Sequence, residues 1–465
     1  MKNAMLISVL VAVSACSRAA DVDMSGRAQE LKGLRWGMFI CWSFSTFSGK
    51  EWTPGVKDVS FFKATGCDTD QWARTAREAG MGYILFLTKH HDGFCLWDTK
   101  TTDRKVTKAP LGRDVLAELK KSCDKHGIKL ALYFSEGEWD WPNKPDGKRY
   151  QANGGYNPEM KKAQLKELLT QYGPIEYIWF DHAIGDGGVS HKETIAFVKA
   201  LQPGCFVGFN HGDQAGADIR LGEMGRPGPL NDHKAAGPHM RDAPSSSYLL
   251  AEFTYPILPP HKGGAMWFYS LPQHDNLCKS AESIYRDYLG AVKYGNIFSL
   301  DVGPDYAGQL REIDVRTLRE VGQMIREKAA LPEPPQSLAA GKAAKSSSTW
   351  PQPGYEAAKA FDGNESTRWG AAADARSGWI EVDLGSPTRI GRARIIERSF
   401  PRTREYAIEY LDGEQWKPLH RGTRIESDKI ITFPPVTAQR VRLNVLKAVE
   451  VPTIEEFQLF APQEK

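Results

Sequence analysis

Three carboxyl groups stand where a catalytic acid, base or nucleophile could act. Asp181 directly follows the apolar run 175–180, so we expect it at the end of a buried strand, where a carboxylate serves as nucleophile or base. Glu252 stands among apolar residues, and loss of hydration there would raise the pKa of its carboxyl, as a general acid requires. Glu223, in a glycine-bounded loop, is the alternative acid. Two structural roles stay open, because a strand-end Asp often caps a loop and a Glu on an edge strand can face water.

Two adjacent histidines, His90 and His91, end a second apolar run, 83–87. On a strand they would point to opposite faces, but on the loop after it both can face one pocket. A metal pair or a solvated loop are the alternatives. A metal site needs further His or carboxylate ligands at a workable spacing, and none lies nearby. Binding of a ligand by both histidines is the prediction we carry forward.

Aromatic side chains recur near the expected strand ends, as sugar-binding pockets need, because the apolar faces of sugars stack on rings. Taken singly, each of these residues is more often part of a core. The candidates for a pocket wall are Trp52, Tyr133, Trp139, Trp141 and Trp267.

The elements that must position these residues alternate between strand-like and helix-like patterns. Apolar runs predict strands at 36–42, 83–87, 128–134, 175–180, 205–209, 249–253, 265–269 and 296–300. Amphipathic segments predict helices at 68–79, 111–126, 158–172, 191–201, 284–294 and 314–328. Repeated β-then-α order indicates a parallel barrel or a doubly wound sheet, and the polar residues after most strands favour a (β/α)8-like TIM barrel over 27–330. Residues 212–244 read as a long loop beside the site.

Beyond the barrel the pattern changes. Residues 331–348 are rich in Pro, Ala, Lys and Ser and read as a linker. Short alternating strands follow at 379–384, 393–397, 406–410 and 440–445. They predict an all-β jelly-roll sandwich over about 337–465.

Composition narrows the possible partners. The formal net charge of +3 over 465 residues does not indicate nucleic acid as a partner. The seven cysteines include no CxxC pair, so buried free thiols are expected rather than a disulfide framework.

The first residues read as an export signal. Residues 1–15 carry one Lys, an apolar run and small residues, as a secretory signal does. Val13-Ser14-Ala15-Cys16 resembles a bacterial lipobox, which implies a lipid on Cys16 as the one link to a membrane. Plain cleavage after Ala15 is the alternative. The expected location is the periplasm or the outer membrane of a bacterium.

Four motifs in order resemble the family 29 glycoside hydrolases, the α-L-fucosidases, over residues 34–328. The motifs are KHHDGFCLWDTKTTD, LAELKKSCDKHGIKLALYFS, QLKELLTQYGPIEYIWFD and MWFYS. The resemblance implies a (β/α)8-like barrel, a retaining mechanism, fucosylated glycans as substrates and no catalytic cofactor.

The same resemblance implies roles for single residues. Asp181 matches the nucleophile, and His90 and His91 match a pair that binds fucose hydroxyls. Tyr133 matches a pocket tyrosine and Trp52 the tryptophan of an EW motif. Trp267 lies in MWFYS, and Cys41 is placed with the substrate-binding residues.

The acid/base and two departures need separate mention. AEFTYPI followed by MWFYS resembles the subgroup that cleaves α-1,3/4-linked fucose, which points to Glu252, with Glu223 as runner-up. The family's FIHWG reads FICWS here, so Cys41 stands where a fucose-binding histidine is usual. His182 follows Asp181 where glycine is common. These changes raise the alternative of a related L-sugar such as L-galactose.

The C-terminal part resembles factor 5/8 type C (discoidin) domains and family 32 carbohydrate-binding modules through AFDGNESTRW, GWIEVDLG and IEEFQLF. That resemblance implies a structural calcium held by Asp362, Asn364, Thr367 and Glu456, with oxygen ligands as calcium requires. The sequence thus predicts a retaining exo-α-L-fucosidase with a C-terminal sandwich. A glycosidase for another L-sugar and a non-catalytic glycan-binding protein are the alternatives.

Overall fold

The structure is a computed structural model of the 465-residue chain that describes residues 22–142, 155–181, 185–210, 215–238, 247–331, 336–365, 367–397, 400–425 and 428–462. The expected signal segment, Cys16 and His182 lie outside these residues. The chain divides into two compact units, the first ending at Leu331 and the second beginning at Pro332. In the described part of the chain, no helix combines the length and the apolar character that crossing a membrane requires.

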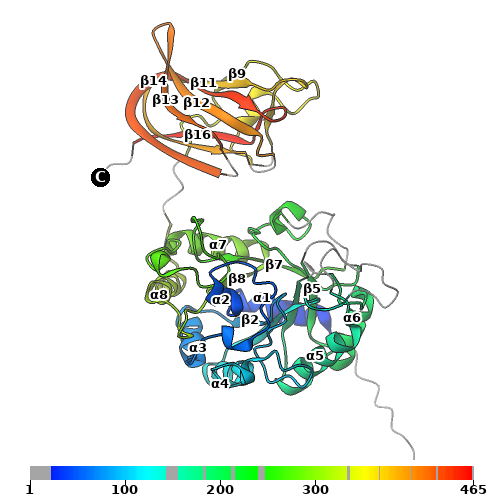
Figure 1. The fold of residues 1–465 in the computed structure, drawn as a ribbon. Helices are drawn as coiled ribbons and strands as arrows, with labels where there is room; N and C mark the ends of the chain where they lie inside the picture. Colours follow the sequence, from blue (N-terminus) through cyan, green and yellow to red (C-terminus); the bar gives the residue numbers. More distant parts are fainter. Residues whose placement is uncertain are drawn as a thin grey trace, which may run out of the picture. The chain divides into compact units, whose positions relative to one another are not determined.

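The first unit is a near-closed barrel of parallel strands, as predicted (Figure 1). Its strands are β1 (Trp36–Ile40), β2 (Tyr83–Lys89), β3 (Lys129–Ser135), β4 (Tyr177–Asp181), β5 (Phe206–Phe209), β6 (Ile219–Arg220), β7 (Leu250–Pro256) and β8 (Ile297–Asp301). The hydrogen-bonded order is β5-β4-β3-β2-β1-β8-β7-β6. The two strands at the ends of this order, β5 and β6, are linked by a backbone hydrogen bond, in which the N–H of Asp218 donates to the carbonyl of Val207 at 2.9 Å.

Helices surround these strands and cover their outer face (Figure 1). They are α1 (Met24–Leu34), α2 (Phe44–Ser48), α3 (Thr69–Glu78), α4 (Val115–His126), α5 (Pro158–Gln171), α6 (His191–Leu201), α7 (Ala281–Tyr294) and α8 (Glu312–Glu327). Asp68 caps α3 by accepting from the N–H of Gln71, and Gly127 ends α4 with a φ of 67°, as the sequence predicts. Every residue of β2 is buried, which explains its unbroken apolar run.

Two predicted features of the barrel are wrong. Residues 265–269 form no strand. Their apolar side chains serve another purpose, because Trp267 packs against Phe39 and Phe268 packs against His90 at the barrel mouth. The missing strand is β6, which lies inside the predicted loop 212–244. A strand of two residues is too short to leave a periodic signal.

The second unit is built of antiparallel strands. They are β9 (Ala343–Ser346), β10 (Trp369–Gly370), β11 (Gly378–Ile396), β12 (Thr403–Asp412), β13 (Gln415–Gly422), β14 (Asp428–Ala448), β15 (Thr453–Ile454) and β16 (Glu456–Phe460). The larger sheet has the order β13-β12-β14-β11-β16, with β9 paired to β11, and β10 pairs with β15. The two predicted strands 379–384 and 393–397 belong to one strand, β11, whose register with β14 shifts between Asp383 and Thr388. Residues 343–346, expected in the linker, form β9 instead.

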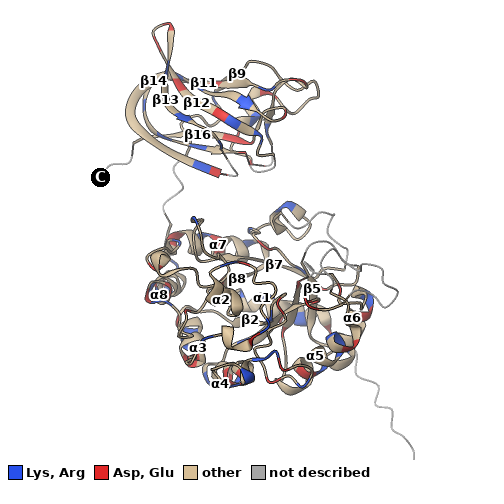
Figure 2. Cartoon of the chain, viewed as in Figure 1, with Lys and Arg blue, Asp and Glu red and all other residues tan. Residues whose placement is uncertain are grey.

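Charges of both signs alternate along the outer helices of the first unit, from α3 to α8 (Figure 2). This distribution agrees with the small net charge of +3. A polyanion would need a broad face of one sign, and the ribbon of these helices carries none.

Because each unit has its own buried apolar cluster, the barrel should fold without the second unit. We expect a fragment that ends at Leu331 to be soluble and to unfold in one cooperative transition, with a midpoint close to that of the barrel in the full chain. Differential scanning calorimetry of both proteins measures this. A fragment that binds a dye for exposed apolar surface and shows no transition would contradict it.

Candidate active site

A cavity opens at the carboxyl ends of the barrel strands, where the sequence predicts the chemistry. Ten side chains line it: Phe39, Cys41, Leu87, His90, Tyr133, Trp179, Asp181, Glu223, Trp267 and Phe268. Glu223 and Trp267 are partly exposed to solvent, and the other eight are buried. Asp181 and Glu223 are the two carboxyl groups of the lining. The volume is about 40 Å³, well below the several hundred Å³ of a typical ligand pocket.

Asp181 is the last residue of β4 and is 7% exposed. The hydroxyl of Tyr133 donates to its Oδ2 at 2.6 Å, and His91 Nε2 lies 3.4 Å from the same oxygen. Burial, and next the charge of Asp181, raise the pKa of Tyr133 well above its usual value. The phenol therefore stays protonated and keeps donating to the carboxylate, which fixes the orientation of Asp181.

His91 is held by Ser135, a residue that the sequence analysis missed. Ser135 donates its hydroxyl to the carbonyl of Gly137 at 2.7 Å and lies 2.6 Å from His91 Nδ1. Because that hydroxyl hydrogen is already used, Nδ1 is the donor of the contact with Ser135, and Nε2 faces Asp181. Ser135 ends an apolar strand, as Asp181 does, and that position was the signal that could have identified it.

His90 lines the cavity with a free acceptor. Its ring packs against His91 with centroids 4.2 Å apart and contacts the edge of Phe268 at 5.3 Å. Burial, and next the neighbouring His91, lower the pKa of His90 well below its usual value, so the ring is neutral. Among the described residues, buried His90 Nδ1 has no hydrogen-bond partner. A ligand hydroxyl could satisfy it.

The aromatic wall consists of Tyr133, Trp179, Phe39 and Trp267. Tyr133 stacks on Trp179 at 5.2 Å, and Phe39 contacts Tyr133 at 5.8 Å and Trp267 at 6.1 Å. Glu51, also missed, holds the segment of Trp267 by accepting the N–H groups of Met266 at 2.8 Å and Trp267 at 3.3 Å.

Three predicted aromatic residues do not line the cavity. The neighbour of Glu51, Trp52, is 61% exposed and absent from the lining, so its predicted place in the pocket is wrong for this structure. Trp139 packs edge-on against His91 at 5.5 Å, and Trp141 lies under the ammonium of Lys89. Both support the site from behind its wall.

Cys41 lies in the cavity wall as a free, buried thiol. Burial, and next the neighbouring Asp301, raise its pKa well above the usual value, so it stays a neutral thiol. Burial also raises the pKa of Asp301 well above its usual value. Cys41 is therefore a protonated thiol in the cavity wall and not a nucleophile.

Glu252 does not reach the cavity. The Glu252 side chain is fully buried and lies behind the ring of Trp179. Trp179 Nε1 is 3.4 Å from Glu252 Oε2. Its Oε1 has no partner among the described residues. Burial raises the pKa of Glu252 to about 7, although hydrogen bonds from Ser299 and Trp179 act in the opposite direction and lower it. The Glu252 carboxyl is desolvated, as the sequence predicts, but it lies in the barrel interior rather than at the mouth. The side chain of a strand residue can point inward below the mouth of a barrel.

Glu223, the runner-up, is the second carboxyl group of the cavity. It follows β6 at a bridge to Thr254, and Asn210 Nδ2 donates to its Oε2 at 2.5 Å. The next residue, Met224, adopts a φ of 55°, a conformation that costs about 1 kcal/mol or more for a residue other than glycine. Such local strain persists where the surrounding structure requires the turn, here the turn that directs Glu223 into the cavity.

In the second unit, the residues expected to hold calcium offer oxygen atoms only. Asp362 accepts from Thr367 Oγ1 at 2.9 Å and from the N–H of Asn364 at 3.0 Å. Glu456 Oε1 is buried with no partner in the described part of the chain, and burial raises the pKa of Glu456 to about 7. Among the described residues, no group of three or more His, Cys, Asp or Glu side chains is arranged so that it could hold a metal ion. The donors therefore fit calcium only if carbonyl and hydroxyl oxygens complete the shell.

The raised pKa of Glu252 makes a prediction about stability. Since the folded-state pKa of about 7 exceeds the usual 4.5, folding favours the protonated form. Its contribution to stability is full below pH 4.5 and is lost as the pH rises through 7. Relative to Glu252→Gln, which mimics the protonated carboxyl, the wild type should lose on the order of 2–3 kcal/mol of unfolding free energy over this range.

Denaturant unfolding of both proteins at several pH values measures this difference. The conservative change Glu320→Gln, at an exposed carboxyl of α8, controls for a general effect of removing a charge. A constant difference between wild type and Glu252→Gln from pH 4.5 to 7 would contradict the raised pKa.

Comparison with known proteins agrees with this geometry. Residues 29–329 match the family model described as alpha-L-fucosidase, and residues 343–457 match that of the F5/8 type C domain. The chain is 30% identical over 308 residues to alpha-L-fucosidase 1 of Arabidopsis thaliana, covering 62% of this chain and 57% of that protein. It is 28% identical over 285 residues to the alpha-L-fucosidase of Dictyostelium discoideum, covering 57% and 56%. The chain thus spans a little over half the length of these two relatives.

A solved structure with a similar fold is the Ruminococcus gnavus GH29 fucosidase in complex with fucose. It has a TM-score of 0.52 and 21% identity, and it covers 94% of both chains. Since the first family model covers well over half of the chain, this protein belongs to the α-L-fucosidase family and carries an F5/8 type C domain.

Proposed function

We propose that this protein is a retaining exo-α-L-fucosidase in which Asp181 is the nucleophile and Glu223 the acid/base. The observation that carries the proposal is that one cavity at the barrel mouth is lined by both carboxyl groups. In a retaining reaction, Asp181 attacks the anomeric carbon while Glu223 gives its proton to the leaving oxygen. Glu223 then takes a proton from water, which releases the sugar from Asp181.

The environments of the two carboxyl groups suit these roles. Asp181 is buried and accepts from Tyr133, so its carboxyl group is held in one orientation. Glu223 is partly exposed, so it can exchange its proton with solvent between the two steps. Glu252 has the raised pKa of an acid, but a side chain with no exposed surface cannot reach a glycosidic oxygen in this arrangement.

The catalytic cavity is small, so its wall matters for how a sugar enters. The cavity of about 40 Å³ is small beside a typical ligand pocket, so we expect part of its wall to move when a sugar binds. Trp267 is the aromatic lining residue that is partly exposed, and its segment is held through the two N–H bonds to Glu51. An outward movement of this side chain would admit the sugar beside His90.

Variants of the two carboxyl groups test their roles with an aryl α-L-fucoside and a fucosylated oligosaccharide. Asp181→Gly should lose nearly all activity and regain some with azide, giving the β-azide. Glu223→Ala should keep turnover of the activated aryl substrate, lose that of the oligosaccharide by about 100-fold or more, and give the α-azide. Glu252→Gln is the matched control and should hydrolyse both substrates. Loss of oligosaccharide cleavage in Glu252→Gln, with Glu223→Ala unaffected, would reverse the assignment.

The alternative sugar, L-galactose, rests on Cys41, which replaces a histidine of the resembling family. A neutral thiol in the wall offers a weaker hydrogen bond than an imidazole does. We expect Cys41→His to change the ratio of kcat/KM for aryl α-L-fucoside and aryl α-L-galactoside by about tenfold, with Cys205→Ala, a buried thiol outside the lining, as control. An unchanged ratio would show that Cys41 does not select the sugar. Wild type that turns over neither glycoside would instead support a non-catalytic glycan-binding protein.

The linkage, the lipid and the calcium are further proposals. Preference for α-1,3/1,4-linked fucose is supported by the AEFTYPI and MWFYS segments, and rates on α-1,2- and α-1,3-fucosylated lactose compare the linkages. A periplasmic or outer-membrane lipoprotein is supported by the residues before Cys16, and the mass of the N-terminal peptide reveals a lipid. A structural calcium is supported by Glu456 Oε1, the buried oxygen without a partner among the described residues.

A further inference from the structure

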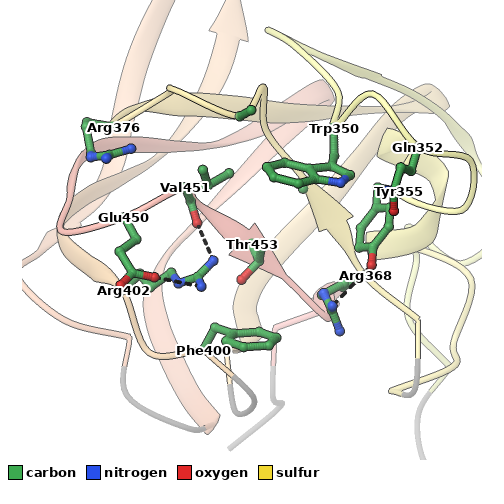
Figure 3. A pocket seen from close by; sticks show the side chains of 12 residues that line it. Trp350, Gln352, Tyr355, Arg368, Arg376, Phe400, Arg402, Glu450, Val451 and Thr453 are labelled. Atoms are coloured by element: carbon green, nitrogen blue, oxygen red, sulfur yellow. Dashed lines mark hydrogen bonds and ion pairs between the residues drawn. The ribbon is translucent and has the colours of Figure 1, made fainter.

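A second cavity lies in the F5/8 type C unit, remote in sequence from the barrel residues. Its volume is about 540 Å³, within the range of small-molecule sites. Described residues of three stretches line it: 350–376 around β10, 400–402 before β12, and 450–453 at the start of β15. Figure 3 shows the side chains of Trp350, Tyr355, Arg368, Phe400 and Arg402 arranged around Thr453.

The lining carries an excess of positive charge. Arg368, Arg376 and Arg402 face one carboxylate, Glu450. Glu450 pairs with Arg402 at 2.7 Å, and Arg402 also donates to the carbonyl of Val451 at 3.1 Å. In the part of the chain that the structure describes, neither Arg368 nor Arg376 has a carboxylate partner. Arg376 donates only to the carbonyls of its own segment, at Asp374 and Ala375.

Arg368 is held in place without being neutralised. Its guanidinium lies 5.1 Å from the ring of Tyr355 and 4.8 Å from that of Phe400, so it is clamped between two aromatic side chains. It donates to the Tyr355 hydroxyl at 3.3 Å, while its buried Nε finds no partner among the described residues. A planar guanidinium fixed in this way presents a fork of N–H donors that matches a carboxylate or a sulfate.

The remainder of the lining suits a sugar ring. Trp350 is half-buried, its indole lies on the cavity in Figure 3, and it meets Tyr355 edge-on with centroids 6.5 Å apart. An indole in such a position can stack on the apolar face of a pyranose. Gln352 and Thr453 add an amide and a hydroxyl that can bond sugar hydroxyls.

We propose that this cavity binds a saccharide that carries a carboxylate or a sulfate group. Arg368 holds the anionic group, and Trp350 stacks on the ring that bears it. The site is separate from the catalytic cavity, and its ligand does not depend on which sugar the barrel hydrolyses. The F5/8 type C unit would then direct the enzyme to acidic glycans.

Calorimetric titration of the full chain with matched sugars tests the charge requirement. Galacturonate and galactose 6-sulfate are each compared with galactose, and glucuronate with glucose. We expect at least one acidic sugar to bind about tenfold more tightly than its neutral parent, and its affinity to fall with added NaCl. Either a carboxylate or a sulfate preference supports the proposal. Equal affinity for acidic and neutral sugars, or no binding of any acidic sugar up to roughly 50 mM, overturns it.

Three variants locate the binding. Arg368→Gln, at the guanidinium between Tyr355 and Phe400, should weaken the acidic sugar about tenfold and leave the neutral parent unchanged. Trp350→Ala should weaken both sugars. Arg389→Gln, at an exposed arginine of β11 outside the lining, should change neither. Unchanged unfolding midpoints show that the variants are folded.

The variants also distinguish other outcomes. Acidic-sugar binding that Arg368→Gln leaves intact would place the anion elsewhere and overturn the proposal. Binding to phosphatidylserine vesicles, with no acidic sugar bound, would mean that the cavity serves a membrane surface and would overturn it too. Activity on an aryl fucoside is not a readout here, so failure of this proposal and failure of the catalytic one are distinguishable.

Discussion

The buried carboxylate of Asp181 is the constraint on which the site depends. A charge taken out of water costs several kcal/mol unless it is paired and hydrogen-bonded. The hydroxyl of Tyr133 donates to Asp181 at 2.6 Å, and the ring of His91, which Ser135 holds, lies 3.4 Å from the same oxygen. These residues come from the ends of β3 and β4 and from the segment after β2. The parallel register of neighbouring strands is therefore what keeps the carboxylate oriented.

Buried ion pairs support this arrangement from behind. Lys89, at the end of β2, lies 2.8 Å from Glu138 and 2.9 Å from Gln164 of α5. Lys161, one helical turn earlier on α5, lies 2.7 Å from Glu136. Both lysines are fully buried, so removing one partner would leave an uncompensated charge. The segment 136–138 is thereby tied to α5, and Gly137, whose carbonyl accepts from Ser135, lies between the two tied glutamates.

Two glutamates show why burial alone does not assign a catalytic role. Glu252 has the raised pKa that a general acid needs, but it lies behind Trp179 with no exposed surface. Glu223 stands at the cavity, partly exposed, and is directed there by the strained turn at Met224. A pKa tells how readily a proton leaves, whereas access decides whether that proton can reach a substrate. The same distinction separates Cys41, a neutral thiol in the wall, from a nucleophile.

The sequence alone determined the barrel, the sandwich, and the place of Asp181, His90, His91, Tyr133 and Cys41 at one mouth, because buried parallel strands are unbroken apolar runs and their polar ends must meet at one edge. It did not determine the acid. A strand side chain points inward or outward by a period of two, and single-sequence patterns do not fix that phase where both faces are buried. Only the tertiary structure placed Glu252 inside and Glu223 at the cavity, removed Trp52 from the lining, and formed β6 from two residues. In the second unit, likewise, Arg368 became a clamped donor only because Tyr355 and Phe400, 45 residues apart, close around it.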